Sequence, residues 1–177
     1  MMIRWDRFNL YLSLALAATL VAGCRSPESK RRKQLTVFRV HLEVHPDGST
    51  LNEPAPIYRQ KPVMVNIEKT PFVTELEVSD AKVLDVMGGF AIQVQFDRHG
   101  SWLIEERSIA NRGKRFAIHC QFGEHLKEAR WLAAPVISRR ISNGVLVFTP
   151  DATRAEADEI VLGLNNVARE VKKKNAW

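Results

Sequence analysis

The amino-acid sequence predicts a two-layer α+β domain, with a mostly antiparallel sheet and two amphipathic helices on one face. Several short segments alternate apolar and polar residues with a period of two, as half-buried strands do. Two longer segments begin instead with helix-capping residues. These segments follow one another as strands, helix, strands and helix, an order typical of the α+β class.

The first predicted strand spans residues 38–44, where large apolar residues alternate with Arg39, His41 and Glu43. Successive side chains of a strand point to opposite faces, so this strand has one buried face and one solvent-facing face. His41 and His45 are expected on the solvent-facing side. They are too far apart along the strand to share a metal ion.

The segment after this strand combines a loop with two further strands. Residues 48–61 are predicted to form a polar loop because they contain Pro54 and Pro56. Alternation resumes in a strand at residues 63–67, and another strand is expected around residues 82–86.

A strand at residues 90–96 leads into the first predicted helix. Asp97 is a good N-cap residue, because its carboxylate accepts hydrogen bonds from the first helical turn. The helix is expected to continue to about residue 111, and Gly113 can adopt the left-handed conformation that ends a helix.

Three more strands and a second helix complete the predicted domain. The strands are expected at residues 115–122, 131–138 and 144–148, and Pro135 marks the middle one as an edge strand or a bulge. Residues 153–156, Thr-Arg-Ala-Glu, form a capping box at the start of the helix. The apolar residues behind this box fall on one helical stripe: Ala157, Ile160, Val161, Leu164, Val167, Ala168 and Val171.

Composition excludes several classes of protein. The chain has 177 residues, of which 45% are hydrophobic and 26% charged, so it is neither disordered, collagen-like nor a coiled coil. Its length suits one domain with a tail. The formal net charge of +6 is concentrated near the two ends, and no strand alternates aromatic with basic residues. No nucleic-acid partner is therefore predicted.

The N-terminus predicts export and lipidation. Arg4 and Arg7 precede a charge-free apolar run that is too short to span a bilayer, so residues 1–23 are interpreted as a signal peptide. Residues 20–24, Leu-Val-Ala-Gly-Cys, resemble a bacterial lipobox, and Cys24 is the predicted lipidation site. The alternatives are an ordinary signal peptide and a buried N-terminal helix with a chance cysteine.

The predicted anchor gives the domain organisation and the location. Residues 24–34 form the lipidated cysteine and a basic tether, and residues 35–174 form the α+β domain. The tether either contacts anionic head groups or is simply solvated. Attachment through lipid predicts a location at the cell membrane, on its extracytoplasmic, periplasmic side.

Motifs for catalysis and cofactor binding are absent. The sequence has no Gly-x-Ser-x-Gly, no P-loop, no dinucleotide fingerprint and no Cys-x-x-Cys. We therefore predict no catalytic residues, no cofactor and no metal site. The remaining alternative is a small-ligand receptor or an enzyme that uses Cys120, His119 and His125. This alternative requires the three side chains to converge in a concave pocket.

Residues 90–118 carry a recognisable series of motifs. An alternating strand ends in Phe-Asp at residues 96–97, and Gly100, Ile104 and Ser108 follow at helical spacing. The series ends in Asn-Arg-Gly-Lys-Arg-Phe-Ala-Ile at residues 111–118. It resembles the head subdomain of the first periplasmic domain of the SecD/SecDF protein-export family. The start of the last helix, at residues 153–157, also fits that pattern.

The resemblance implies a fold and a capacity to contact polypeptide. The chain departs from the family where residues 121–130 replace a shorter turn, and where Pro150 and Ala152 replace a usual glycine and phenylalanine. It also has no transmembrane block, so the proton-driven motor of SecD-type factors is not implied.

The sequence therefore predicts a lipid-anchored, non-enzymatic module outside the cytoplasm. Its expected partner is a polypeptide or an envelope protein, with a link to protein export. If residues 131–137 or 38–44 form an exposed sheet edge, that edge can pair with an extended peptide.

Overall fold

The computed structural model describes residue 31 and residues 33–175. The predicted signal peptide, Cys24 and most of the basic tether lie outside the described residues. The described part contains two α-helices and three antiparallel sheets, which confirms the α+β class. Neither helix in it is both long and apolar enough to cross a membrane.

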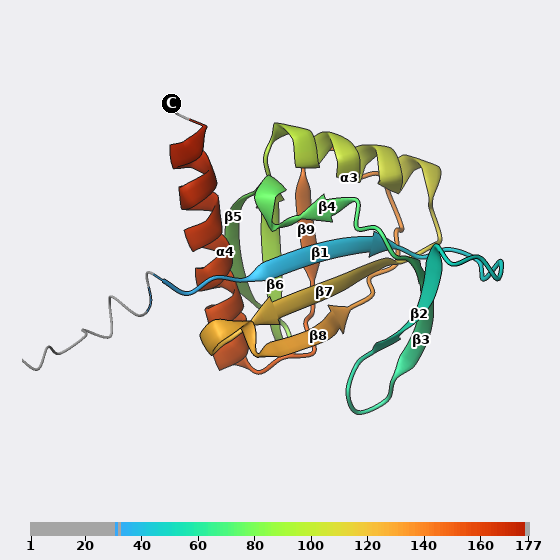
Figure 1. Ribbon diagram of the computed structural model, residues 1–177, viewed down its shortest axis with the longest axis horizontal. Coiled ribbons are helices and arrows are strands. Elements are labelled where there is room, and N and C mark those ends of the chain that lie inside the picture. The colour runs from blue at the N-terminus through green and yellow to red at the C-terminus, as the bar shows by residue number, and fades with distance from the viewer. Residues whose placement is uncertain (1–30, 32, 176–177) are drawn as a thin grey trace, which may run out of the picture. The chain divides into compact units, whose positions relative to one another are not determined.

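The strands are divided among three sheets rather than joined in the single sheet that we expected (Figure 1). The first sheet has the order β4-β1-β7-β8 and consists of β4 (Val73–Thr74), β1 (Val37–Leu42), β7 (Phe116–Phe122) and β8 (Glu128–Ala133). The second has the order β5-β6-β9 and consists of β5 (Val78–Val86), β6 (Gly89–Phe96) and β9 (Val145–Phe148). The third is a hairpin of β2 (Asn52–Ile57) and β3 (Val63–Glu68).

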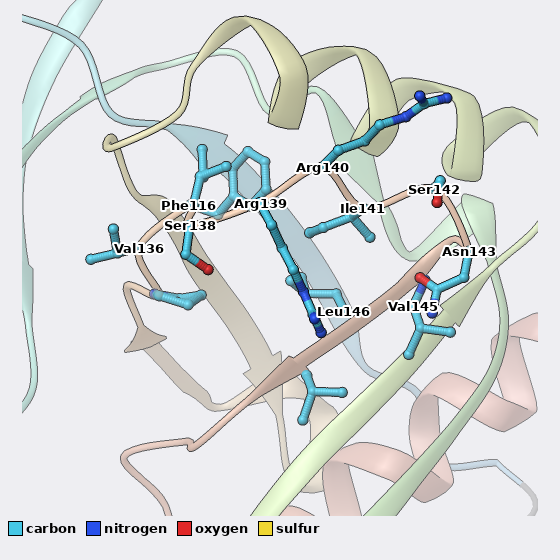
Figure 2. Close-up of a pocket in the computed structure, with 13 residues that line it drawn as sticks. Phe116, Val136, Ser138, Arg139, Arg140, Ile141, Ser142, Asn143, Val145 and Leu146 are labelled. Carbon is cyan, nitrogen blue, oxygen red and sulfur yellow. The ribbon is translucent and has the colours of Figure 1, made fainter.

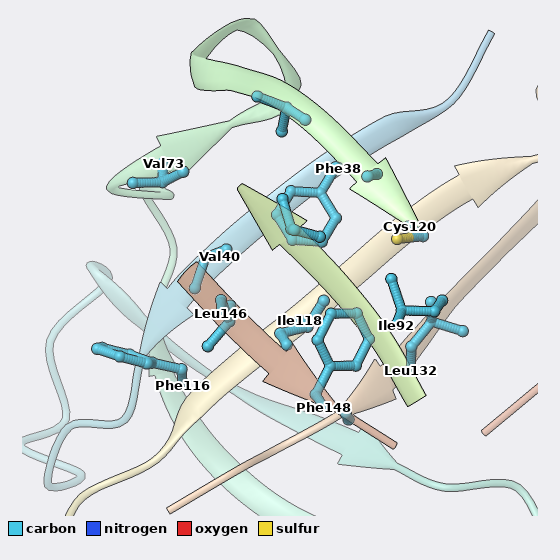
Figure 3. Packing of buried hydrophobic residues seen from close by; sticks show 14 of the residues in the cluster. Phe38, Val40, Val73, Ile92, Phe116, Ile118, Cys120, Leu132, Leu146 and Phe148 are labelled. Carbon is cyan, nitrogen blue, oxygen red and sulfur yellow. The ribbon is translucent and has the colours of Figure 1, made fainter. Parts of the chain in front are cut away.

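The main core lies where the first and second sheets cross (Figure 3). Phe38 of β1 lies 6.4 Å, between ring centroids, from both Phe96 of β6 and Phe148 of β9. Each sheet contributes the apolar side of its alternation, as the sequence indicates. Burial of these large side chains supplies the main driving force for folding.

The two predicted helices both pack on the sheets, and each has its main contacts with different strands. Helix α4 (Arg154–Lys174) lies along β5, whereas α3 (Arg98–Ala110) lies over β4 and β6 and over the 3-10 turn η1 (Glu75–Glu77) (Figure 1). The buried residues of α3 are Gly100, Ile104 and Ser108. A Cβ at position 100 would lie 2.7 Å from the Cβ of Glu77, so only glycine permits this approach.

The predicted helix ends are confirmed by the capping geometry. The Asp97 carboxylate accepts a hydrogen bond from the Gly100 N–H at 2.8 Å, and Gly113 has a φ of 86°. At α4, Thr153 and Glu156 form the predicted capping box. Capping of this kind contributes typically about 1 kcal/mol to stability.

The prediction of a loop at residues 48–61 was wrong, because residues 52–57 form β2. Residues facing each other in an antiparallel pair alternate between hydrogen-bonded and non-hydrogen-bonded positions. The Lys69 N–H donates to the Leu51 carbonyl, which places Pro54 and Pro56 at non-hydrogen-bonded positions of the β2–β3 ladder. The prolines therefore remove no bond between the strands, and their missing N–H groups lie on the outer edge of β2.

Candidate functional site

A hollow of about 530 Å³ lies beside β9 (Figure 2). Its walls come from β9, from residues 135–137 after β8, and from the loop at residues 138–143. The apolar lining residues are Phe116, Pro135, Val136, Ile137, Ile141, Val145, Leu146 and Val147. Ligand sites in proteins are commonly concave and mostly apolar with a few polar groups, and this hollow fits that description.

The backbone of β9 faces the hollow with unpaired peptide groups. The Phe96 N–H donates to the Gly144 carbonyl at 2.9 Å, so the alternation of the ladder directs the peptide groups of Leu146 and Phe148 toward β6. The peptide groups of Val145 and Val147 then point to the outer side. The Val145 N–H donates to Asn143 Oδ1 at 3.2 Å, and no described residue pairs with the peptide groups of Val147.

Hydrogen bonds from β6 and α3 hold β9 and the loop before it in place. Gln95 Nε2 donates to the carbonyls of Asn143 and Gly144 at 3.3 and 3.2 Å. Ser108 Oγ accepts a hydrogen bond from the Ile141 N–H at 2.9 Å, which ties the loop to α3. Two residues that carry the family resemblance in α3, Gly100 and Ser108, thus position this helix and the loop of the hollow.

The edge of β5 is blocked by a side chain of α4. The Ala81 N–H donates to Asn165 Oδ1 at 2.9 Å, and Asn165 Nδ2 donates to the Ala81 carbonyl at 2.8 Å. This amide occupies the position that a neighbouring strand would take.

Other strand edges in the described residues are shortened or blocked. β4 is only two residues long. The Leu132 carbonyl of β8 accepts a hydrogen bond from the Asp151 N–H at 2.7 Å. The outer edge of β2 carries two prolines, and β3 is flanked by Val44, whose N–H donates to the Asn66 carbonyl at 2.9 Å.

Exposed edges attract further strands, and natural proteins cover them in these ways. The edge of β9 stays open.

These findings revise the edges that we expected. The strand at residues 38–44 is not an edge, because β1 lies between β4 and β7. β8 does end its sheet, so the edge predicted from Pro135 is confirmed. The strand itself ends at Ala133, before Pro135, and its register shift lies opposite Ile118 and His119. Sequence reasoning did not identify the hollow. The one feature of the sequence that indicates this hollow is the pair of arginines, Arg139 and Arg140, between two apolar segments.

Cys120, His119 and His125 do not converge in a pocket. Cys120 is 0% exposed and points into the main core, where burial raises the pKa of its thiol well above the usual range. His119 lies on the opposite face of β7, and His125 lies in the exposed turn after that strand. The geometric requirement of the alternative site is not met. No group of three or more His, Cys, Asp or Glu residues within the described ranges is arranged to hold a metal.

His41 is buried, which corrects the expectation of a solvent-facing histidine. The β2–β3 hairpin covers its face of β1, and His41 Nδ1 lies 2.9 Å from the Glu68 carbonyl oxygen. The rings of His41 and His119 pack edge-on against Trp131, with centroid distances of 5.2 and 5.0 Å. Burial lowers the pKa of both histidines, because the charged imidazolium loses its hydration there.

The fold is that of an α+β domain in which β9 ends its sheet. A family model described as "SecDF, P1 head subdomain" matches residues 50–168. The chain therefore belongs to the SecDF P1 head subdomain family.

Two solved structures share the fold at low sequence identity. One, described as "Structure and function of a membrane component SecDF that enhances protein export", has a TM-score of 0.55 and 20% identity over 82% of this chain and 71% of its own. The other, "Crystal structure of SecDF in Super-membrane-facing form", has a TM-score of 0.54 and 20% identity. The match covers 80% of this chain but only 21% of that longer one. A search of curated protein sequences gave no match.

Proposed function

We propose that this chain is a lipid-anchored, extracytoplasmic module that binds extended polypeptide along β9, in a role linked to protein export. The observation that carries the proposal is the open edge of β9, with the Val147 peptide groups facing an apolar hollow. Membership of the SecDF P1 head subdomain family supports the link to export. The role is one of binding and not of catalysis.

Strand addition suits a partner whose sequence varies. The main-chain hydrogen bonds contribute affinity whatever the side chains are, at about 0.5–1.5 kcal/mol net for each bond. The hollow beside β9 then accepts apolar side chains through its aliphatic lining and Phe116. An unfolded chain in transit presents both features, extended backbone and exposed apolar side chains.

A proline at position 147 tests this mode of binding. Val147→Pro removes the outward N–H and places a ring against the incoming strand, but it breaks no ladder bond to β6. We expect the affinity for short apolar peptides to fall about tenfold, which corresponds to about 1.4 kcal/mol. Val147→Thr keeps both the N–H and the β-branched shape and is the matched control. Equal binding by both variants would rule out strand addition at β9.

The lipid anchor is tested separately, because Cys24 lies outside the described residues. Cys24→Ser should leave an unprocessed precursor or release the protein from the membrane fraction. A variant that matures and fractionates like the wild type would contradict the proposed anchor.

Crosslinking in cells distinguishes the two kinds of partner. A photo-reactive residue at position 147 should capture exported chains or translocon components if the role is in export. Capture of resident envelope proteins alone would favour a structural role.

A further inference from the structure

The hollow beside β9 has a one-sided charge. Its charged lining residues are Arg139 and Arg140, and the lining contains no Asp or Glu. Serine and asparagine side chains make up the rest of its polar lining. An apolar hollow with positive charge at its rim discriminates among segments that would otherwise pair equally well with β9.

The two arginines differ in their partners. Arg140 Nε donates to Glu105 Oε1 of α3 at 2.6 Å, and a second contact joins the same two side chains. Figure 2 shows Arg140 pointing away from the hollow, whereas Arg139 extends along the hollow toward β9. Within the described part of the chain, no acidic side chain pairs with Arg139. Its guanidinium is therefore the free positive charge at the open edge.

We infer that the segment bound along β9 carries an acidic side chain, which forms an ion pair with Arg139. The inference rests on the proposed function, because it specifies the partner of the same groove. A guanidinium offers planar pairs of N–H donors that match a carboxylate. A side chain can supply the carboxylate while the backbone continues along β9, so we assign it to Asp or Glu and not to a chain terminus.

Charge also argues against the tether of this chain as the occupant. Residues 30–33 read Lys-Arg-Arg-Lys, and a segment of this charge would be repelled by Arg139. The favoured partner is thus an extended segment of another chain with alternating apolar residues and at least one acid.

The test compares short synthetic peptides that alternate valine and threonine and differ only at one central residue. This residue is Glu, Gln or Lys, and both termini are blocked so that no other carboxylate is present. Binding to the full-length protein is measured by fluorescence anisotropy. We expect the Glu peptide to bind about fivefold more tightly than the Gln peptide, as for a partly exposed ion pair. The preference should shrink as salt is raised toward about 1 M.

Variants assign the preference to one side chain. Arg139→Gln should abolish the preference, so that the Glu and Gln peptides bind this variant with equal affinity. Arg140→Gln is the matched control, because it removes the same charge from a side chain held by Glu105, and it should keep the preference.

Each remaining outcome overturns a defined claim. Peptides that bind at β9, as shown by their loss in Val147→Pro, but with equal affinity for Glu and Gln would overturn the acid preference and leave the proposed function intact. Failure of every peptide to bind would overturn both. Tighter binding of a Gln peptide with a free C-terminus than of the blocked Glu peptide would overturn the assignment to a side chain.

Discussion

The side-chain amide of Asn165 in α4 forms two hydrogen bonds with the backbone of Ala81 in β5, one in each direction, at 2.9 and 2.8 Å. A neighbouring strand would make the same pair of bonds. The helix thereby covers the edge of β5 at Ala81, whereas at the other end of the β5-β6-β9 sheet no described residue pairs with the outward peptide groups of Val147 in β9.

The first prediction is that Asn165→Ala destabilises the domain by roughly 1–3 kcal/mol. The substitution leaves a partly buried N–H and carbonyl of Ala81 without their protein partner. The free energy of unfolding is measured by urea denaturation. Lys172→Ala is the control, because Lys172 Nζ donates to Ser79 on the same edge from an exposed position. It should change stability by no more than about 0.5 kcal/mol, and an equal loss in both variants would contradict the role given to Asn165.

The second prediction concerns the buried stripe of α4. Leu164 is 0% exposed and belongs to the main core, so Leu164→Ala should cost roughly 2–5 kcal/mol. Arg169 is exposed on the other side of the helix, and Arg169→Ala should stay within about 0.5 kcal/mol. Denaturant melts of the two variants give the comparison. Glu159 is a poorer control than Arg169, because it accepts a hydrogen bond from Gln34.

The third prediction is a loss of stability on mild acidification. The pKa values of His41 and His119 are lowered from 6.5, chiefly by burial, so the unfolded chain binds protons at a higher pH than the folded domain does. Their contribution to stability is fully present above about pH 6.5 and is lost as the pH falls from there toward the lower pKa values of the folded state. Thermal melts between about pH 8 and pH 5 should show the midpoint falling over this window.

Charges around the two histidines set the controls. The positive charge of Arg39 opposes protonation of both rings. A charge on His41 also opposes protonation of His119. Glu53 and Glu68 favour the charged form of His41. His41→Asn keeps a donor near the Glu68 carbonyl and should flatten the pH dependence. The same substitution at the exposed His45 is the control and should leave the pH dependence of the melting midpoint as it is in the wild type. If His41→Asn also leaves this pH dependence unaltered, groups other than His41 cause it.

Local signals in the sequence were sufficient for both helices. The Asp97 cap and the Thr153 capping box act within one turn of chain, so their effect can be read from neighbouring residues. The strands β6 and β7 were likewise predictable, because their alternation is regular.

The features that the sequence did not predict depend on contacts between distant segments. Pro54 and Pro56 indicated a loop, because sequence alone does not say which positions of a strand are hydrogen-bonded. The exposure of His41 was also misjudged, because it depends on the packing of β3 and of Trp131 against that face of β1, and no local pattern reports this packing. The open edge of β9 depends on which edges are covered elsewhere, such as that of β5 by Asn165, and no pattern within residues 145–148 reports that.

The last prediction is that Gly163→Ala destabilises the domain, although alanine normally stabilises a helix interior by about 1 kcal/mol relative to glycine. A Cβ at position 163 would lie 2.1 Å from Thr36 Oγ1 and 2.8 Å from both the Leu35 carbonyl carbon and the Thr36 nitrogen. Thr36 is 1% exposed and leads directly into β1, so this backbone cannot move away without disturbing the core. We expect a loss of about 1–3 kcal/mol in the free energy of unfolding. Repeating the substitution in a Thr36→Ala background removes the hydroxyl contact but keeps the two backbone contacts, so most of the loss should remain. A gain in stability in either background would show that the segment before β1 does not pack against α4.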